Sequence, residues 1–592
     1  MHKYELGIIG NCSYIAYIDK QTNVKWMCMP KFDSSFLFGS LLDSQKGGEF
    51  RIIPEDNTDI RYEQSYLENT NILCTVFHTS KGKFRVTDFA PRFQQNDRNF
   101  RPLMLVRKIE VLEGHPEIKV VCNPVYEYGN LKPTIVQGSN HIQYENLGNP
   151  VRLTTDIPLS YILSGNSFLL TEPKYLVFTY GVPLEAPIEE TCEEFLKKTI
   201  HYWRKWVKTT YVPSIYQEQI IRSALALKLH QYEDTGGIIA SGTTSLPEFN
   251  ESTRNWDYRY CWIRDSYYTL RAFNSMGHFE ELERYFRFIE NIIHRETDRI
   301  QPLYSITGDK KITEQEIPLE GYLGVNKPVR IGNDAYTHIQ NDVYGQVLAS
   351  MLPLYIDKRL AHLSKLNHDM IYKVVRLIEK TIDEPDAGLW EFRNKSQLHC
   401  YTFLFQWVGA KAAVKIAKIF EDDVLYRLAV ELEKKASDKI EECYDPNLRA
   451  YTQAVGNSNM DASCLQLITM NYLDNKSERA RQHLEAIEKK LVTPDGLVYR
   501  YLHEDDFGKP QSTFLICSFW YVEALACVGR MEEAQKIFEK LLKKATNHLN
   551  LLSEDIMEDG SQWGNFPQTY SHAGLMNAAF RIARKLDRPI FL

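Results

Sequence analysis

Short apolar runs separated by polar turns fill the first third of the chain. "SYIAYID" and "VKWMCMP" flank the turn "KQTN", and "NILCTVFHT" and "KFRVTDFA" flank "SKG". "MLVRKIEVL" and "EIKVVCNPV" flank "EGHP" in the same way. Because short β-rich runs with little helical periodicity are typical of antiparallel sheets, the pattern predicts a β-sandwich over residues 1–188.

The spacing of apolar residues then changes to three and four. In "EETCEEFLKKTIHYWRKWVKTT" this spacing predicts a linker helix over residues 189–210, and about twelve helical segments follow over residues 211–592. Two of them, "GHFEELERYF" and "GRMEEAQKIF", share Gly, paired Glu and Phe at the same offsets. They are either unrelated helix starts or repeated helical hairpins. With the helix count, we expect a ring of about six inner and six outer helices whose connections meet at a central pit.

Composition and charge narrow the class of protein. The chain has 592 residues, of which 44% are hydrophobic and 25% charged, as in ordinary globular proteins. Its net charge of −7 makes nucleic acid an unexpected partner. The first residues lack a signal-peptide pattern, and no apolar run approaches the roughly 18 residues of a membrane span. Eleven cysteines scattered without a CxxC pair favour reduced thiols, so we expect a cytoplasmic protein with no membrane partner.

Several connections between the helical segments are rich in aromatic and charged residues. The stretch 247–273 brings Tyr258, Trp262, Arg264 and Asp265 together. Aromatic faces stack on the apolar faces of sugars, and fixed charged groups bind sugar hydroxyls. The alternative is a helix start in which the charges pair with neighbours and the aromatics belong to the core. Arg500, between two tyrosines, is a further candidate.

Two glutamates occupy similar connections. Glu391 follows Trp390 in "DAGLWEFRNK", and Glu554 follows Ser553 in "NLLSEDIMEDG". An apolar wall beside Glu391 would keep it protonated, as a general acid requires; the alternative is a solvated loop acid. Inverting hydrolysis of an acetal needs such an acid and a base about 6.5–9.5 Å apart. The sequence requires only that both loops reach the same end of the ring.

Long motifs in the chain resemble glycoside hydrolase family 15, the glucoamylase-like family. They are "NWDYRYCWIRDS", "PVRIGNDAYTHIQNDVYGQV", "DAGLWEFR", "CSFW" and "LLSEDIMEDGSQWGNFPQTYSHAGL". The stretch "GIIGNCSYIAYIDKQTNVKWMCMPKFDSSFLFGSLLD" extends the resemblance to the N-terminus. The resemblance implies an N-terminal antiparallel β-sandwich, a linker and an (α/α)6-barrel catalytic domain, which agrees with the periodicity.

The resemblance also implies roles for individual residues. Glu391 matches the family's general acid and Glu554 its general base. No organic cofactor or catalytic metal is implied, and the acidic loop "HEDD" (503–506) favours solvation over calcium binding. The substrate-binding residues implied are Arg264 and Asp265 for the terminal glucose, Tyr258 and Trp262 lining its subsite, Trp390 beside the acid, and Arg500 for the next sugar.

Two departures from the family pattern concern the second sugar. Phe392 stands where fungal-type glucoamylases have a second acid, and Gln511 and Ser512 replace a frequent Glu-Gly pair. The favoured function is an inverting exo-acting α-glucoside hydrolase that releases β-glucose from the non-reducing ends of malto- or isomalto-oligosaccharides. The alternative is a trehalase of the same family acting on α,α-trehalose. Both glutamates argue against a non-catalytic carbohydrate-binding regulator, and Glu554 argues against a phosphorylase.

Overall fold

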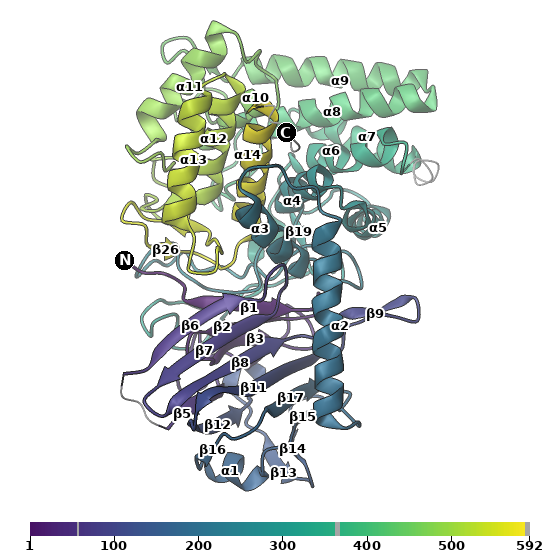
Figure 1. Cartoon of the computed structure of the whole chain (residues 1–592). Helices are drawn as coiled ribbons and strands as arrows, with labels where there is room; N and C mark the ends of the chain where they lie inside the picture. Colours follow the sequence, from purple (N-terminus) through teal and green to yellow (C-terminus); the bar gives the residue numbers. More distant parts are fainter. Residues whose placement is uncertain (56–58, 361–367, 587–592) are drawn as a thin grey trace.

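A ring of helices lies above a β-sandwich in the view of Figure 1, and a long helix connects the two parts. The structure is a computed structural model that describes residues 1–55, 59–360 and 368–586. The order of a sandwich followed by a helical domain confirms the predicted fold class. Within the described residues, no helix is long and apolar enough to cross a membrane.

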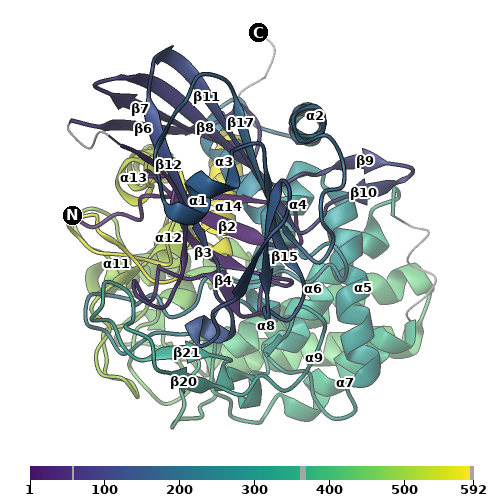
Figure 2. The same ribbon diagram turned by 90° about the horizontal axis from the view of Figure 1, so that it is seen from below.

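The sandwich is built from antiparallel sheets (Figure 2). Its largest sheet has the order β13 (Thr134–Gln137), β14 (His141–Glu145), β15 (Val151–Thr155), β17 (Lys174–Tyr180), β11 (Met104–Gly114), β8 (Gly82–Phe89), β7 (Leu73–Thr79) and β6 (Arg61–Tyr66). A second sheet contains β1 (Leu6–Gly10), β2 (Ile15–Asp19), β3 (Val24–Cys28) and β4 (Phe36–Phe38), and a third contains β16 (Phe168–Leu169), β12 (Glu117–Asn123) and β5 (Glu49–Pro54). The ribbon β9 (Phe93–Gln95) and β10 (Arg98–Phe100), the helix α1 (Leu159–Ser164) and the 3-10 turn η1 (Glu127–Gly129) complete this part.

Of the three strand pairs that the sequence pattern predicts, two form hairpins and one does not. β2 pairs with β3, and β7 pairs with β8, as hairpins. The third pair does not form a hairpin, because β11 pairs with β8 and β17 whereas β12 pairs with β5 and β16 in another sheet. The turn between them therefore carries the chain from one sheet to another.

The helix α2 (Ile188–Lys208) connects the two parts. It packs against β9 and β17 of the sandwich. Near its end, Trp206 Nε1 donates to Glu281 Oε1 of the helical ring at 3.0 Å.

The helical part is a double ring. Neighbour contacts run from α4 through α6, α8, α10, α12 and α14 back to α4, which closes the inner ring. The inner helices are α4 (Ile263–Met276), α6 (Val343–Ile356), α8 (Cys400–Phe420), α10 (Gln466–Thr469), α12 (Leu515–Cys527) and α14 (Thr569–Leu586). The outer helices are α3 (Gln217–Leu229), α5 (Phe279–Arg295), α7 (His368–Thr381), α9 (Asp423–Glu441), α11 (Glu478–Leu491) and α13 (Met531–Ala545).

Burial separates the two rings. Every residue of α12 is buried, whereas α13 buries one face and exposes charged residues on the other. Helices that are apolar all round lie inside a fold, and amphipathic helices cover it. The repeated motifs fall at inner-to-outer turns, where Gly277 (φ 81°) follows α4 and Gly529 (φ 90°) follows α12. This confirms that both motifs start the second helix of a hairpin.

Short strands and turns lie in the other set of connections, which run from each outer helix to the next inner helix. They are β18 (Cys261–Trp262), β19 (Leu303–Tyr304), β20 (Gln315–Ile317), β21 (Val329–Ile331), η2 (Asp334–Thr337), β22 (Tyr444–Asp445), β23 (Ala450–Tyr451), η3 (Ala462–Leu465), β24 (Thr513–Phe514), β25 (Asp555–Ile556) and β26 (Gln562–Trp563). The N-terminus lies beside β26 (Figure 1), where the backbone N–H of Gln562 donates to the carbonyl of His2 at 2.9 Å.

Candidate active site

One cavity that is open to solvent lies among the outer-to-inner connections of the helical ring. Every site residue expected from the sequence contributes to its walls. They are Tyr258, Trp262, Arg264, Asp265, Trp390, Glu391, Arg500 and Glu554. Residues far apart in the chain are therefore brought to one place, and the chemical role of each stays a prediction.

Glu391 lies between α7 and α8 in a left-handed backbone conformation, with φ of 62°. Trp262 Nε1 donates to its Oε1 at 2.6 Å, and Gln340 Nε2 lies 3.4 Å from the same oxygen. Arg264 Nη2 lies 3.6 Å from Oε1. All these contacts fall on one carboxylate oxygen and hold the side chain in a fixed orientation.

The indole that donates a hydrogen bond to Glu391 belongs to Trp262 and not to the adjacent Trp390. Trp390 Nε1 donates instead to Asp461 Oδ2 at 2.8 Å, and its ring packs against Phe514. Neighbours in a turn can direct their side chains to different partners. Trp390 thus forms part of the cavity wall, while the hydrogen bond to Glu391 comes from Trp262.

Asp386 anchors the loop that carries Glu391. Its Oδ1 accepts from Gly388 N at 3.0 Å, and its Oδ2 accepts from Asn341 N at 2.7 Å and Thr402 Oγ1 at 2.9 Å. Burial, followed by the nearby Asp342, raises the pKa of Asp386 to about 7. Sequence reasoning assigned it no role. An Asp directly before an Ala-Gly turn was the available signal, since such side chains commonly cap turns.

Glu554 lies directly before β25 and is 2% exposed. Tyr258 Oη donates to its Oε1 at 2.7 Å, and Asn565 N donates to its Oε2 at 3.2 Å. Gly564, with φ of 74°, packs so closely that a Cβ there would lie 2.5 Å from Glu554 Cβ. The absence of a side chain at residue 564 is thus what allows Glu554 its position.

The rings that contact the two glutamates are neighbours. Tyr258, which binds Glu554, and Trp262, which binds Glu391, meet edge to face with centroids 5.4 Å apart. The single segment 258–262 therefore positions both carboxyl groups in the same cavity. A pair of carboxyl groups facing one cavity is the arrangement that glycoside hydrolysis uses.

Glu554 belongs to a buried acidic cluster that sequence reasoning missed in part. Carboxylate oxygens of Glu248, Glu554 and Asp555 lie within 4.8 Å of one another, and this is the one potential metal-binding group among the described residues. Arg500 forms an ion pair with Glu248, and Arg254 Nε lies 3.8 Å from the same carboxylate. These arginines supply positive charge to the cluster.

The cluster changes the acidity of Glu554. Burial raises its pKa to about 8, and the negative charge of Glu248 adds to the increase. Hydrogen bonding from Tyr258 and the charge of Arg500 act in the opposite direction. The opening "PEFN" of the aromatic stretch was the available signal for Glu248.

Arg264 and Asp265 open the inner helix α4. Arg264 Nη1 donates to Leu389 O at 2.6 Å, which ties the start of α4 to the Glu391 loop. Arg264 Nε and Asp265 Oδ2 form a buried ion pair with each other at 3.4 Å. Burial raises the pKa of Asp265 to about 6, whereas Arg264 lowers it. Charged side chains that are held in place at the cavity wall suit the binding of sugar hydroxyls.

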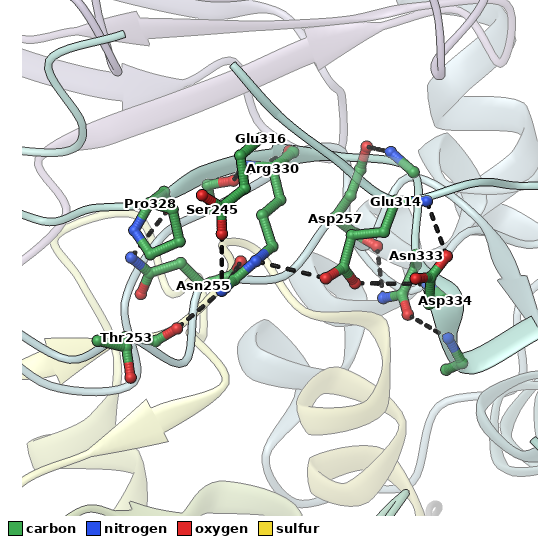
Figure 3. A network of polar contacts seen from close by, with 12 residues as sticks. Ser245, Thr253, Asn255, Asp257, Glu314, Glu316, Pro328, Arg330, Asn333 and Asp334 are labelled. Atoms are coloured by element: carbon green, nitrogen blue, oxygen red, sulfur yellow. Dashed lines mark hydrogen bonds and ion pairs between the residues drawn. The ribbon is translucent and has the colours of Figure 1, made fainter. Parts of the chain in front are cut away.

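The segment with Trp256 forms another wall of the cavity. Figure 3 shows how Arg330 of β21 holds this segment by donating to Thr253 O at 2.9 Å and Asn255 O at 3.1 Å. The Arg330 guanidinium also lies over the Trp256 ring, 4.5 Å from its centroid. The β20–β21 hairpin therefore supports this wall of the cavity. It lies in the connection between α5 and α6.

The residues that depart from the family pattern lie in different surroundings. Phe392 lines the cavity, where its ring lies near Tyr501 and His503. Gln511 is exposed, and Ser512 is buried and donates to Asp555 Oδ1 at 3.1 Å. The first departure is thus at the cavity, and the second reaches it through the acidic cluster.

Comparisons with known proteins agree with this architecture. The family model described as glycosyl hydrolases family 15 matches residues 214–580, and the model described as trehalase-like, N-terminal matches residues 4–158. A solved bacterial glucoamylase complexed with acarbose has a TM-score of 0.71 at 15% identity, covering 98% of this chain and 94% of that one. This likeness shows the (α/α)6-barrel fold.

Curated relatives span nearly the whole chain. A trehalase of Thermoplasma volcanium is 32% identical over 99% of this chain and 93% of its own length. A trehalase of Mycolicibacterium smegmatis is 31% identical over 98% and 91%, and trehalase 1 of Sulfolobus acidocaldarius is 30% identical over 97% and 97%. The chain therefore belongs to glycosyl hydrolases family 15 and is a glycoside hydrolase.

Proposed function

We propose that the chain is a trehalase, an inverting hydrolase that splits α,α-trehalose into two glucose molecules. Support comes from the relatives named trehalase, which are 30% to 32% identical across almost the full chain. The likeness to a glucoamylase concerns the fold alone, at 15% identity. Of the two activities left open by the motifs, the relatives favour trehalose hydrolysis over release of glucose from malto- or isomalto-oligosaccharides.

Glu391 is the proposed general acid. Its Oε1 is engaged by the Trp262 indole and lies near Gln340 and Arg264, so we assign the transferable proton to Oε2. This proton passes to the oxygen between the two glucose rings as the bond from that oxygen to the attacked anomeric carbon breaks. The leaving glucose then departs as a neutral molecule.

Glu554 is the proposed general base. Its carboxylate is oriented by the Tyr258 hydroxyl and the backbone N–H of Asn565. It takes a proton from a water molecule that attacks the anomeric carbon from the face opposite the leaving oxygen. The attacked glucose is released as the β anomer, and the leaving glucose keeps its α configuration.

The terminal glucose would be held by Arg264 and Asp265. Both side chains line the cavity, and their guanidinium and carboxylate groups, held by a mutual ion pair, can exchange hydrogen bonds with its hydroxyls. Fixing this ring places the anomeric carbon between the two glutamates, and positioning of that kind supplies a large share of rate enhancement. Tyr258 and Trp262 provide the aromatic side of the same subsite.

The observation that carries the proposal is the shared cavity of Glu391 and Glu554 in a chain whose full-length relatives are named trehalase. Initial rates of glucose release from trehalose, maltotriose and isomaltotriose test it, with Glu391→Gln as the inactive control. We expect kcat/KM for trehalose to exceed both others at least tenfold. Faster cleavage of either trisaccharide would contradict the proposal and would favour hydrolysis of malto- or isomalto-oligosaccharides instead.

A further inference from the structure

The outer wall of the cavity is made by a short turn, residues 503–508, which we call the rim loop. Asp505, Asp506 and Phe507 of this loop line the cavity together with Trp256 and Arg393. Arg393 stands two residues beyond Glu391, and both line the cavity, so this wall adjoins the proposed acid. That is the side on which the leaving glucose would lie.

Phe507 contacts other residues of this wall. Its ring meets Trp256 edge to face, with centroids 5.0 Å apart. The Arg254 guanidinium lies 5.6 Å from the ring centroid and that of Arg393 lies 5.5 Å from it. Aromatic and cation–π contacts on several sides hold the ring in one place.

Ionic contacts hold the backbone of the rim loop. Arg254 pairs with Asp505, and both side chains are only 5% exposed. Arg254 Nη2 also donates to Gly508 O at 2.8 Å. Because this ion pair is buried, moving the loop aside would leave charges without partners, which is strongly unfavourable.

The facing segment is tied to the same loop. Asp506 Oδ2 accepts from the backbone N–H groups of Arg393 and Asn394, at 2.5 Å and 3.3 Å. Arg393 in turn pairs with Glu314 at 2.9 Å and lies over Trp256, 4.4 Å from its centroid. Glu314 belongs to the polar network around Arg330 (Figure 3), so the wall joins four separate segments of the chain.

We propose that the rim loop limits the substrate to two sugar rings, with Phe507 as the residue that determines this specificity. The inference rests on the proposed trehalose hydrolysis and names the substrate class of the same cavity. A leaving glucose fits inside the wall, whereas a third ring attached to it meets the Phe507 side chain. Because the ring is held by Arg254, Arg393 and Trp256, it does not swing away to make room.

The test compares trehalose with 4-O-α-glucosyl-trehalose. Both present the same terminal α,α-linked glucose, so linkage is unchanged and only the leaving group grows. We expect kcat/KM for the trisaccharide to be at least tenfold lower in the unmodified enzyme. Phe507→Ala should raise the trisaccharide-to-trehalose ratio about tenfold. Asp506→Ala, a change at an exposed position that loosens the wall, should raise it in the same direction.

Leu502→Ala is the matched control, because Leu502 is an exposed apolar residue just before the rim loop and does not line the cavity. Its ratio should equal that of the unmodified enzyme. Equal kcat/KM for the two substrates in the unmodified enzyme would overturn the inference. So would a Phe507→Ala enzyme that loses both activities in proportion, since Phe507 would then be only a stacking surface. Absence of trehalose cleavage in the unmodified enzyme would instead refute the proposed function.

Discussion

At the scale of single residues, the proposed mechanism depends on two carboxyl groups held by different partners. We predict that Glu391→Gln and Glu554→Gln each lower kcat by roughly 10²–10⁴-fold, the usual worth of general acid–base catalysis. Neither change removes packed volume, so the melting temperature should stay close to that of the unmodified enzyme. Steady-state kinetics with trehalose and thermal unfolding measure both quantities. A Glu554→Gln enzyme with near-normal kcat would show that Glu554 is not the general base.

The acidic cluster predicts a pH effect of definite sign. Glu554 acts as a base only when it is ionised. Because its pKa is raised, kcat/KM should fall on the acid side at a pH well above the pKa of an ordinary glutamate. Glu248→Gln removes a negative charge beside Glu554, which makes its ionised form easier to reach. The acid limb should therefore move to lower pH, although burial keeps it above the ordinary value.

The pH profile of Glu316→Gln is the control for this shift. Glu316 is 65% exposed and lies next to Arg330, outside the acidic cluster. Its removal should leave the acid limb in place. An acid limb that does not move in Glu248→Gln, with normal folding, would show that Glu248 does not control the ionisation of Glu554.

At the scale of elements, one glycine decides the position of the Glu554 loop. Gly564→Ala would put a Cβ 2.5 Å from Glu554 Cβ, so the loop must shift. We predict a loss of kcat of at least tenfold. The left-handed backbone adds about 1–2 kcal/mol of destabilisation for any L-residue.

Gly529→Ala separates the two effects. Gly529 also has a left-handed backbone, with φ of 90°, but its Cβ would meet nothing within 4 Å. It should lower the melting temperature by a similar amount and leave kcat unchanged. Equal kinetics for the two variants would contradict the steric argument at Glu554.

Local elements could be predicted from the sequence, while their partners could not. The helix periodicity and the glycines before the two repeated motifs located the hairpins α4–α5 and α12–α13, because both signals act within a few residues. The strands β11 and β12 were recognisable, but their separation into different sheets depends on contacts with β8 and β5, far away in the chain.

The same limit applies to the candidate site. Motifs located Glu391 and Glu554, but the indole that binds Glu391 comes from Trp262, in a connection well before it in the chain. Asp386 lies in the motif "DAGLWEFR" and Glu248 in the aromatic stretch, but their importance follows from which groups the fold brings beside them. Adjacency in sequence placed Trp390 beside Glu391, but it could not reveal the hydrogen bond from Trp262, because contacts in loops are set by tertiary packing.

At the scale of the whole molecule, the sandwich supports the cavity directly. Arg259 lies one residue after Tyr258 and is fully buried. Its Nη2 lies 2.7 Å from Asp257 Oδ2, and its Nη1 donates to Ser34 O of the sandwich at 2.8 Å. Beside Glu554, Tyr4 Oη donates to Gly564 O at 2.9 Å. The segment 258–262 and the loop of Gly564 therefore both contact the N-terminal domain.

We predict that Arg259→Met strongly destabilises the full chain, because it leaves Asp257 buried without its partner. Loss of one member of a buried pair typically costs about 3–5 kcal/mol. Urea unfolding measures this change. Arg152→Met is the matched control, since Arg152 pairs with the exposed Glu185 and should cost about 1 kcal/mol or less. Equal stability of the two variants would contradict a structural role for the Arg259 junction.

The most direct test of the central claim is proton NMR of trehalose hydrolysis with resolution of the glucose anomers. In the first minutes, before mutarotation mixes the products, an inverting trehalase releases α-glucose and β-glucose in equal amounts. This result would support Glu391 as the acid and Glu554 as the base that activates water. Release of α-glucose alone would mean retention at the anomeric carbon and would contradict the proposed mechanism. No release of glucose would contradict the trehalase assignment itself.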